Sequence, residues 1–127
     1  MIDHISIVSN NLEKSRDFYA AALKPFGYES INSIDDVASW NMGITGCSFG
    51  ENKETRLWIS GEGERAKAHI AFGAKDHATV DAFYAAAIAA GGTDNGAPGL
   101  RTQYSPDYYA AFVIDPDGNN IEAVCRH

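Results

Sequence analysis

An internal repeat constrains the fold of this chain more than any other feature of its sequence. A shift of 65 residues, the separation of His4 from His69, aligns two His-Ile words. The same shift places the word Phe-Tyr-Ala-Ala-Ala at 18–22 on an identical word at 83–87. Because the shift is close to half of the 127 residues, we interpret the chain as a tandem duplication of one unit.

Each copy of the unit starts with a strand and continues into a helix. Apolar residues at alternating positions predict the opening strands within residues 2–8 and 70–72. Apolar side chains at helical spacing follow in both copies, and Asn10 is predicted to cap the first helix. Gly27 and Gly92, also related by the shift, end the two helical patterns. The apolar stripe on each helix is typical of core packing.

Three shorter strands are predicted after each helix. The first copy has them at 28–34, 37–42 and 56–60, separated by glycine-rich breaks at 43–50 and 61–63. The second copy has them near Thr93 and at 108–114 and 120–124, with a long loop at 96–106 and a turn at 115–119. The pattern predicts an α+β fold of two tandem βαβββ modules, about 1–64 and 65–127, that form one domain with a curled mixed sheet inside and helices outside.

The bulk composition excludes several classes of function. A formal net charge of −7 argues against negatively charged partners, so neither nucleic acid nor a membrane is expected to bind. No apolar run approaches the roughly 20 residues of a membrane span, and the N-terminal residues lack the pattern of a signal peptide. The two cysteines, Cys47 and Cys125, are too few for a disulfide framework, so we expect a cytoplasmic protein with reduced thiols.

Two histidines and one glutamate are the candidate metal ligands. His4 and His69 occupy the same place in their modules, so an approximate twofold relation between the modules would bring both imidazoles together. Glu122 interrupts an apolar strand, where a carboxylate either faces solvent or needs a partner. Two imidazoles and one carboxylate form a set that binds a divalent metal and leaves coordination positions open. We therefore predict a metal site made of His4, His69 and Glu122.

The chain resembles the vicinal oxygen chelate superfamily, which includes glyoxalase I, extradiol dioxygenases, fosfomycin-resistance enzymes and bleomycin-resistance proteins. The resemblance rests on the duplicated unit, the repeated His-Ile and the sequence Asp-Pro-Asp-Gly-Asn-Asn-Ile-Glu at 115–122, and it covers essentially the whole chain. It implies that a divalent ion (zinc, nickel, manganese or iron) is held at the three matched positions, where a small substrate chelates it through neighbouring oxygens. It also implies that Glu122 is the catalytic residue that moves a proton.

Other side chains are expected at the mouth of this site. Arg101 suits a carboxylate on a substrate, Tyr104 lies in the same long loop, and Trp58 is a candidate aromatic wall, although core packing explains Trp58 about as well. The shift of 65 places Glu122 on Leu57, so a fourth ligand of the glyoxalase I kind is not expected. The resemblance leaves two arrangements open: one site within the chain, or a homodimer whose sites are shared between chains.

Three functions are consistent with these features. The first is a metal-dependent glyoxalase-like enzyme with lyase or isomerase chemistry on a small oxygen-chelating substrate, which the presence of all three ligands favours. The second is a metal-free ligand-binding protein of the bleomycin-resistance kind, in which Trp40, Trp58 and the tyrosines carry the function. The third is an extradiol-type dioxygenase, which requires Fe(II). The sequence does not fix the substrate.

Overall fold

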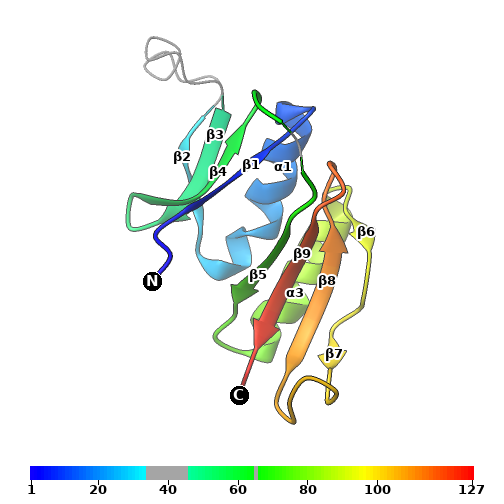
Figure 1. The fold of residues 1–127 in the computed structure, drawn as a ribbon. Coiled ribbons are helices and arrows are strands. Elements are labelled where there is room, and N and C mark those ends of the chain that lie inside the picture. Colours follow the sequence, from blue (N-terminus) through cyan, green and yellow to red (C-terminus); the bar gives the residue numbers. More distant parts are fainter. Residues whose placement is uncertain (34–45, 65) are drawn as a thin grey trace.

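The computed structural model describes residues 1–33, 46–64 and 66–127. It contains two copies of the predicted unit, which we call the first and second modules (Figure 1). The first module consists of β1 (Ile5–Val8), α1 (Leu12–Ala22), the 3-10 turn η1 (Lys24–Phe26), β2 (Glu29–Asn32), β3 (Gly46–Glu51) and β4 (Glu54–Ser60). The second module consists of β5 (His69–Gly73), α3 (His77–Ala89), β6 (Thr93–Asp94), β7 (Gly99–Leu100), β8 (Tyr109–Ile114) and β9 (Asn120–Cys125).

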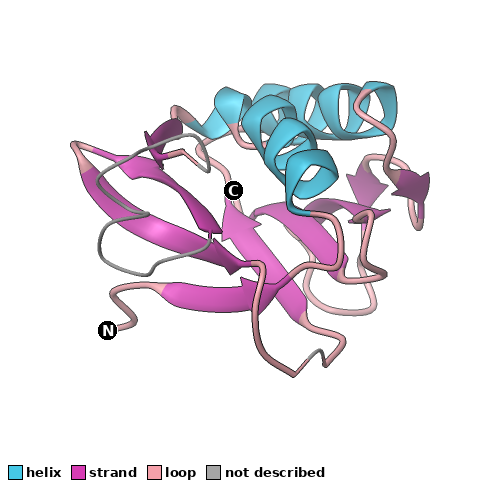
Figure 2. Ribbon diagram, turned by 90° about the horizontal axis from the view of Figure 1, so that it is seen from above, coloured by secondary structure: helices cyan, strands magenta, loops and turns pink. Residues whose placement is uncertain are grey.

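Each module forms its own sheet, and the two sheets share one strand arrangement. The first has the order β1-β4-β3-β2 and the second β5-β9-β8-β6, with the short strand β7 also paired to β8. In both sheets the first strand lies parallel to the last strand of its module. Helices α1 and α3 cover the same side of the molecule (Figure 2), so each sheet has one face against a helix and one open face. The predicted α+β fold of two βαβββ modules is confirmed. The predicted strand at 37–42, which contains Trp40, lies outside the described residues.

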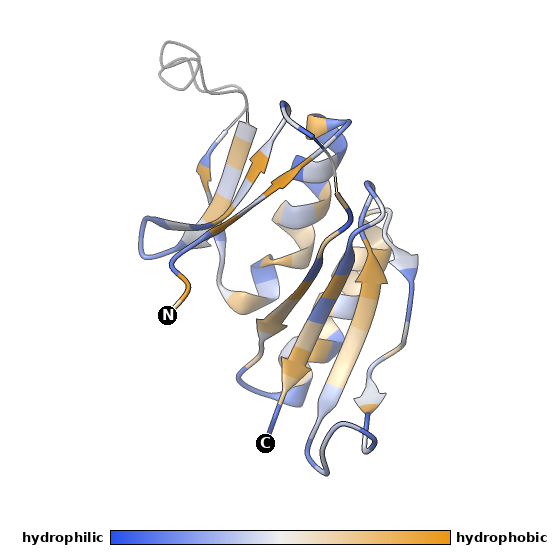
Figure 3. Cartoon of the chain, viewed as in Figure 1, coloured by the Kyte–Doolittle hydropathy of each residue, from blue (hydrophilic) through white to orange (hydrophobic). Residues whose placement is uncertain are grey.

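Apolar side chains between the sheets and the helices form a continuous core. Its members come from both modules and include Phe18 and Phe83, which are equivalent in the repeated word. Phe26 joins the modules, because its ring centroid lies 5.6 Å from that of Phe72 and 5.8 Å from that of Phe83. In Figure 3 apolar colouring runs along strands of both sheets, whereas turns at the strand ends are polar. The helical stripes therefore pack in the core, as predicted.

Two glycines explain why a predicted break is a strand. The expectation of a break was wrong at 46–50, because β3 begins at Gly46, and its first part, 43–45, lies outside the described residues. A Cβ atom at Gly46 would lie 2.4 Å from the backbone oxygen of Ile59, and one at Gly50 would lie 1.8 Å from that of Glu54. The glycines therefore allow β3 to approach β4 closely, and they do not end the strand.

The first helix has its N-cap one residue later than predicted. The cap is Asn11, whose side chain accepts a hydrogen bond from the backbone amide of Lys14 at 3.1 Å. The assignment of the cap to Asn10 was therefore wrong. The backbone amide of Asn10 instead donates a hydrogen bond to the carboxylate of Asp117, at 2.9 Å, in the second module. A long-range contact thus determines which of two adjacent asparagines caps the helix.

The turn between β8 and β9, within the second module, forms hydrogen bonds with the first module. Asp115 is buried, and its carboxylate accepts hydrogen bonds from the backbone amides of Asp117 and Asn119 and from the Asn119 side chain. It also accepts a hydrogen bond from the hydroxyl of Tyr19 on α1, at 2.5 Å. Burial, reinforced by the charge of Asp115, raises the pKa of Tyr19 well above its usual value. Gly118 supplies the positive φ of 88° that the turn requires, so the predicted turn is confirmed and has a structural role.

Candidate active site on the open face of the second module

Glu122 is a buried acid at the centre of the second sheet. It lies on β9, which is flanked by β5 and β8, and only 2 % of its surface is exposed. Its side chain is on the open face, because its neighbours Ile121 and Ala123 belong to the core. The hydroxyl of Tyr108 donates a hydrogen bond to its Oε1 atom at 2.5 Å. Glu122 therefore does not face bulk solvent, and one of its two oxygens is already engaged.

His69 faces the other oxygen of Glu122. Its Nε2 atom lies 3.1 Å from Oε2 of Glu122, and its Nδ1 atom lies 3.0 Å from the backbone oxygen of Asn120. Because a carbonyl oxygen only accepts hydrogen bonds, Nδ1 carries the ring proton. In a neutral imidazole Nε2 is then an acceptor, and it faces a second acceptor in the carboxylate. This contact requires a cation on or between the two atoms, either a proton or a metal ion.

A cavity of about 590 Å³ opens in front of this pair. Small-molecule sites commonly measure roughly 300–1,000 Å³. The side chains that line it around the pair are mostly aromatic or polar: Gln103, Tyr104, Tyr108, Phe112, Asn120 and Arg126. The rings of Tyr104 and Tyr108 meet edge to face with centroids 5.1 Å apart. Burial, followed by the hydrogen bond to Glu122, raises the pKa of Tyr108 to about 12, so Tyr108 stays protonated and donates its hydrogen bond at neutral pH.

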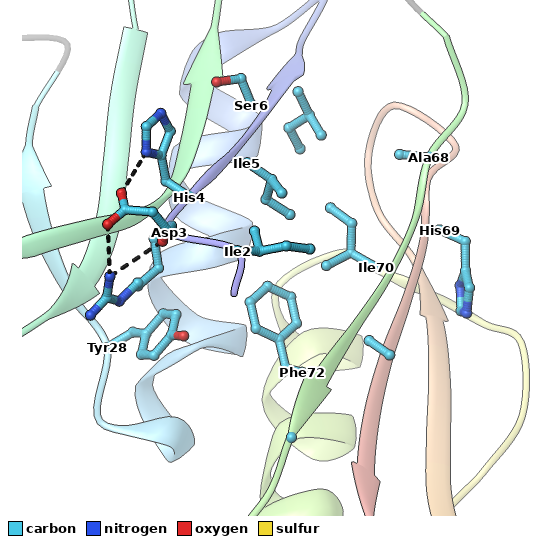
Figure 4. Close-up of a pocket in the computed structure, with 14 residues that line it drawn as sticks. Ile2, Asp3, His4, Ile5, Ser6, Tyr28, Ala68, His69, Ile70 and Phe72 are labelled. Atoms are coloured by element: carbon cyan, nitrogen blue, oxygen red, sulfur yellow. Dashed lines mark hydrogen bonds and ion pairs between the residues drawn. The ribbon is translucent and has the colours of Figure 1, made fainter.

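His4 lies apart from this pair within the same chain. Its Nδ1 atom is 2.7 Å from the carboxylate of Asp3, and Arg56 donates a hydrogen bond to the backbone oxygen of Asp3 at 3.3 Å. The His4 side chain is 58 % exposed. Figure 4 shows His4 and His69 pointing away from one another, with apolar side chains such as Ile70 between them. These apolar side chains line a second cleft, of about 610 Å³, between β1 and β5. Both histidines border this second cleft, and their rings do not converge across it.

The second module supplies two of the three predicted metal ligands. Within the described part of the chain, no group of three or more His, Cys, Asp or Glu side chains is close enough to hold a metal ion. The pair of His69 and Glu122 nevertheless has the features of half a metal site. The Nδ1 proton of His69 is held by a backbone oxygen, as in many metal-binding histidines, and its Nε2 lone pair faces the carboxylate. This donor set fits a divalent ion at two positions, and His4 of the same chain is outside it.

The three predicted substrate-binding residues have different surroundings. Tyr104 lines the cavity and is 63 % exposed. Arg101 does not line it, because its guanidinium donates to a backbone oxygen of its own loop at 2.6 Å and lies 5.6 Å from the centroid of the Phe112 ring. Trp58 is in the first module, on the open face of β4, where its ring packs over Gly46. Of the three, Tyr104 alone borders the cavity.

Strand pairing gives Glu122 a different counterpart in the first module than the sequence shift does. The shift of 65 places Glu122 on Leu57, which belongs to the core. In the sheets, Glu122 pairs with Ala71, and Ser6, the repeat partner of Ala71, pairs with Trp58. The last strands are therefore offset by 64 residues, from 58 to 122, and the assignment to Leu57 was wrong by one residue. The first module has a tryptophan where the second has its buried acid.

Three residues of the cavity, Phe112, Asn120 and Arg126, were not predicted from the sequence. Asn120 supplies the backbone oxygen that holds the ring of His69, and Arg126 supplies a cation. Arg126 directly follows β9 and comes four positions after Glu122, so the strand alternation continued by one residue puts both on one face, and this period-two pattern was the available signal. A backbone oxygen leaves no comparable signal in the type of residue that carries it.

Comparison with known proteins identifies the family of the chain. A profile of the "Glyoxalase/Bleomycin resistance protein/Dioxygenase superfamily" matches residues 1–123. The chain belongs to this superfamily. The resemblance noted in the sequence is thereby confirmed.

Solved structures of superfamily members cover nearly all of the chain. A glyoxalase/bleomycin resistance protein from Albidiferax ferrireducens T118 is 30 % identical, with a TM-score of 0.76 and 98 % of each chain covered. The lactoylglutathione lyase of Agrobacterium tumefaciens is 18 % identical, with a TM-score of 0.69 over 98 % of this chain and 92 % of its own. A glyoxalase/dioxygenase from Nostoc punctiforme is 21 % identical, with a TM-score of 0.69 over 100 % of this chain and 91 % of its own. The last two similarities show the fold alone. A search of curated protein sequences finds no significant match.

The helices of the second module and of the first are short. None of the helices in the described ranges combines the length and the apolar character that a membrane span requires.

Proposed function

We propose that this superfamily member is a metal-dependent glyoxalase-like enzyme that acts on a small substrate with neighbouring oxygen atoms. The observation that carries the proposal is the contact of 3.1 Å between Nε2 of His69 and Oε2 of Glu122, two acceptors that face each other at a cavity of suitable size. A divalent ion (zinc, nickel, manganese or iron) would replace the proton that otherwise bridges them. The lactoylglutathione lyase that shares this fold supports lyase or isomerase chemistry by analogy.

The residues of the second module have distinct roles in this proposal. A metal held by His69 and Glu122 would supply Lewis acidity for a carbonyl or hydroxyl oxygen of the substrate. Glu122 is the catalytic residue, and it accepts a proton from the substrate carbon beside that oxygen and returns it to a neighbouring atom. Tyr108 holds Oε1 of Glu122 by a hydrogen bond, which leaves Oε2 on the side of His69. Because the pKa of Tyr108 is about 12, this hydrogen bond persists throughout the neutral range.

The third ligand in the proposal is His4 of a second copy of the chain. Within one chain His4 and His69 point away from each other, yet His4 is exposed and its Nδ1 is already paired with Asp3, so its Nε2 atom is available. A symmetric homodimer repeats one contact twice. In such a dimer each copy gives His4 to the pair of His69 and Glu122 in the other.

The metal is tested by elemental analysis of the purified protein and by thermal unfolding with and without added ion. We expect about one divalent ion per chain, and near-complete loss of it in His69→Ala and Glu122→Gln. His77→Ala is the matched control, because His77 is also exposed but stacks on Tyr109 away from the cavity. Wild-type protein without metal, and without stabilisation by any added ion, would contradict the proposal.

The sharing of His4 is tested by mixing two inactive variants, His4→Ala and His69→Ala. If sites form between copies, a mixed dimer contains one intact site and one that lacks both histidines. Random exchange in an equal mixture makes half of the dimers mixed, so roughly a quarter of the sites should bind metal again. A site within one chain would give no recovery, because neither variant then has both histidines.

A second candidate is a metal-free ligand-binding protein, which the same contact also supports. An imidazolium at His69 paired with the carboxylate of Glu122 satisfies both groups with a proton, and among the described residues of one chain no third metal-ligating side chain joins this pair. In this case the cavity and its aromatic walls carry the function. Absence of metal together with tight binding of a small molecule would favour this candidate over the first.

A further inference from the structure

Arg126 is a cation without an ion-pair partner among the described residues of an acidic protein. The chain has a formal net charge of −7, yet no carboxylate of the described residues forms an ion pair with Arg126. Its guanidinium lies 4.8 Å from the centroid of the Tyr108 ring, and the residue lines the cavity of the second module. Glu122 is the single acid among the described residues that line this cavity, and its oxygens are engaged by Tyr108 and His69.

Tyr108 spans the space between Arg126 and Glu122. Its hydroxyl is 2.5 Å from Oε1 of Glu122, and its ring lies beneath the guanidinium of Arg126. A ligand no longer than a tyrosine side chain can therefore reach both ends. One end of such a ligand meets the pair of His69 and Glu122, and the other meets a planar cation whose N–H groups match a carboxylate.

We infer that Arg126 binds a carboxylate of the substrate, so that the substrate class is a small monocarboxylate whose far end carries two neighbouring oxygens. The aromatic rings of Tyr104, Tyr108 and Phe112 line the space between the two ends and suit an unsaturated or aromatic body. A single guanidinium matches one carboxylate in charge and shape, and the inference rests on the proposed function only for the oxygen-bearing end. In this role Arg126 takes the place of Arg101, the carboxylate partner expected from the sequence. Arg101 donates a hydrogen bond within its own loop and does not line the cavity.

The test compares a charged ligand with its neutral counterpart. The probes are 3,4-dihydroxybenzoate and its methyl ester, which keep the neighbouring oxygens and the ring but differ in charge. Binding is measured by calorimetry on the full chain, once with chelator and once with saturating Zn²⁺. We expect the wild-type protein to bind the acid roughly tenfold or more tightly than the ester.

Substitutions assign this preference to one arginine. Arg126→Gln should remove the preference for the acid and leave the affinity for the ester unchanged, whereas Arg126→Lys should retain part of it because the charge remains without the planar fork. Arg101→Gln is the matched control and should keep the full preference. Equal binding of acid and ester by the wild-type protein, or loss of the preference in Arg101→Gln alone, would overturn the inference.

The outcome is separable from that of the proposed function. If Zn²⁺ does not bind but the acid preference is present and depends on Arg126, the carboxylate site stands and the metal-dependent enzyme does not. If Zn²⁺ binds and acid and ester are equivalent, the metal site stands and the carboxylate site does not.

Discussion

The two modules have the same strand order and helix placement, but their open faces differ in chemistry. At equivalent register positions the second module has Glu122, buried and hydrogen bonded, and the first has Trp58, packed over a glycine. The histidines differ in the same way. His69 is held by a backbone oxygen and faces an acid, whereas His4 is held by the exposed carboxylate of Asp3. The two modules therefore share one backbone arrangement, but the buried acid and the histidine that faces it are present in the second module alone among the described residues.

This difference shows that a duplicated fold does not require a duplicated site. The core faces of the two sheets must remain apolar, since both pack against helices in one continuous core. The open faces carry no such requirement, so they can diverge without cost to the fold. Three pairs of substitutions, each with one residue in either module, measure how far the two modules differ in stability.

The largest expected effect on stability comes from the turn between β8 and β9, which is hydrogen bonded to the first module. Asp115 is buried and accepts four hydrogen bonds, whereas Glu51, its counterpart at the offset of 64, is exposed. Asp115→Asn should lower the free energy of unfolding by about 3 kcal/mol, because an amide nitrogen would face hydrogen-bond donors in a buried place. Glu51→Gln should change it by less than about 0.5 kcal/mol. Urea titrations of the two variants measure the difference, and equal effects would show that the turn does not stabilise the chain.

A smaller difference is expected between Gly27, which is the C-cap of η1, and Gly92, which follows the C-cap of α3. A Cβ atom at Gly92 would lie 2.4 Å from the Val113 side chain and 2.8 Å from Phe18, so Gly92→Ala should lower the free energy of unfolding by roughly 2–3 kcal/mol. Gly27 has open space around it but a φ of +82°, so Gly27→Ala should cost about 1 kcal/mol. Thermal unfolding of both variants provides the measurement. The reverse order would mean that backbone strain outweighs crowding at these helix ends.

The smallest expected effect is the dependence of stability on alkaline pH. The pKa of Tyr108 is raised from 10.0 to about 12, chiefly by burial and then by Glu122. Between about pH 10 and about pH 12 the folded chain keeps this phenol protonated, whereas the unfolded chain ionises it. The contribution of Tyr108 to the free energy of unfolding is therefore complete below about pH 10 and is lost as pH rises toward about 12. The Tyr108→Phe variant should therefore lose roughly 1 kcal/mol less stability at alkaline pH than the wild-type protein. This difference is smaller than the full pKa shift implies, because the ring is partly exposed to solvent.

Tyr28 of the first module is the control for this titration. Burial also raises its pKa, with a further contribution from Glu51 that Arg56 opposes. Tyr28→Phe should therefore flatten the alkaline loss less than Tyr108→Phe does. Urea midpoints recorded at about pH 9 and about pH 11 compare the two variants. A larger change in Tyr28→Phe would mean that the hydrogen bond to Glu122 contributes little to the shift.

The fold could be predicted from the sequence because its signals are local and repeated. The apolar periodicity of 80–88 and the glycine after it define a helix without knowledge of the rest of the chain. The errors arose where distant residues decide the outcome. Asn10 and Asn11 are equivalent as local caps, and the contact with Asp117 selects between them. Gly46 ends a strand in a local interpretation, but the approach of β4 makes it part of one.

The candidate site was predictable in its residue types but not in their arrangement. His69 and Glu122 lie together because β5 and β9 are neighbours, which the parallel pairing of first and last strands requires. The position of His4 depends on how the two sheets lie relative to each other, and no residue pattern encodes that angle. The carboxylate-binding role expected of Arg101 stays a prediction; in the structure its guanidinium donates to a backbone oxygen of its own loop, a contact that no residue pattern encodes.

The parallel pairing of the first and last strands also bears on how such a chain can arise and be rearranged. Because β1 runs parallel to β4 and β5 parallel to β9, the start and the end of each module lie at opposite ends of a strand pair. Each module is therefore crossed along the length of a strand between its entry and its exit. A circular permutation of one module would need a linker that runs back along that length before a new opening is made in a surface loop.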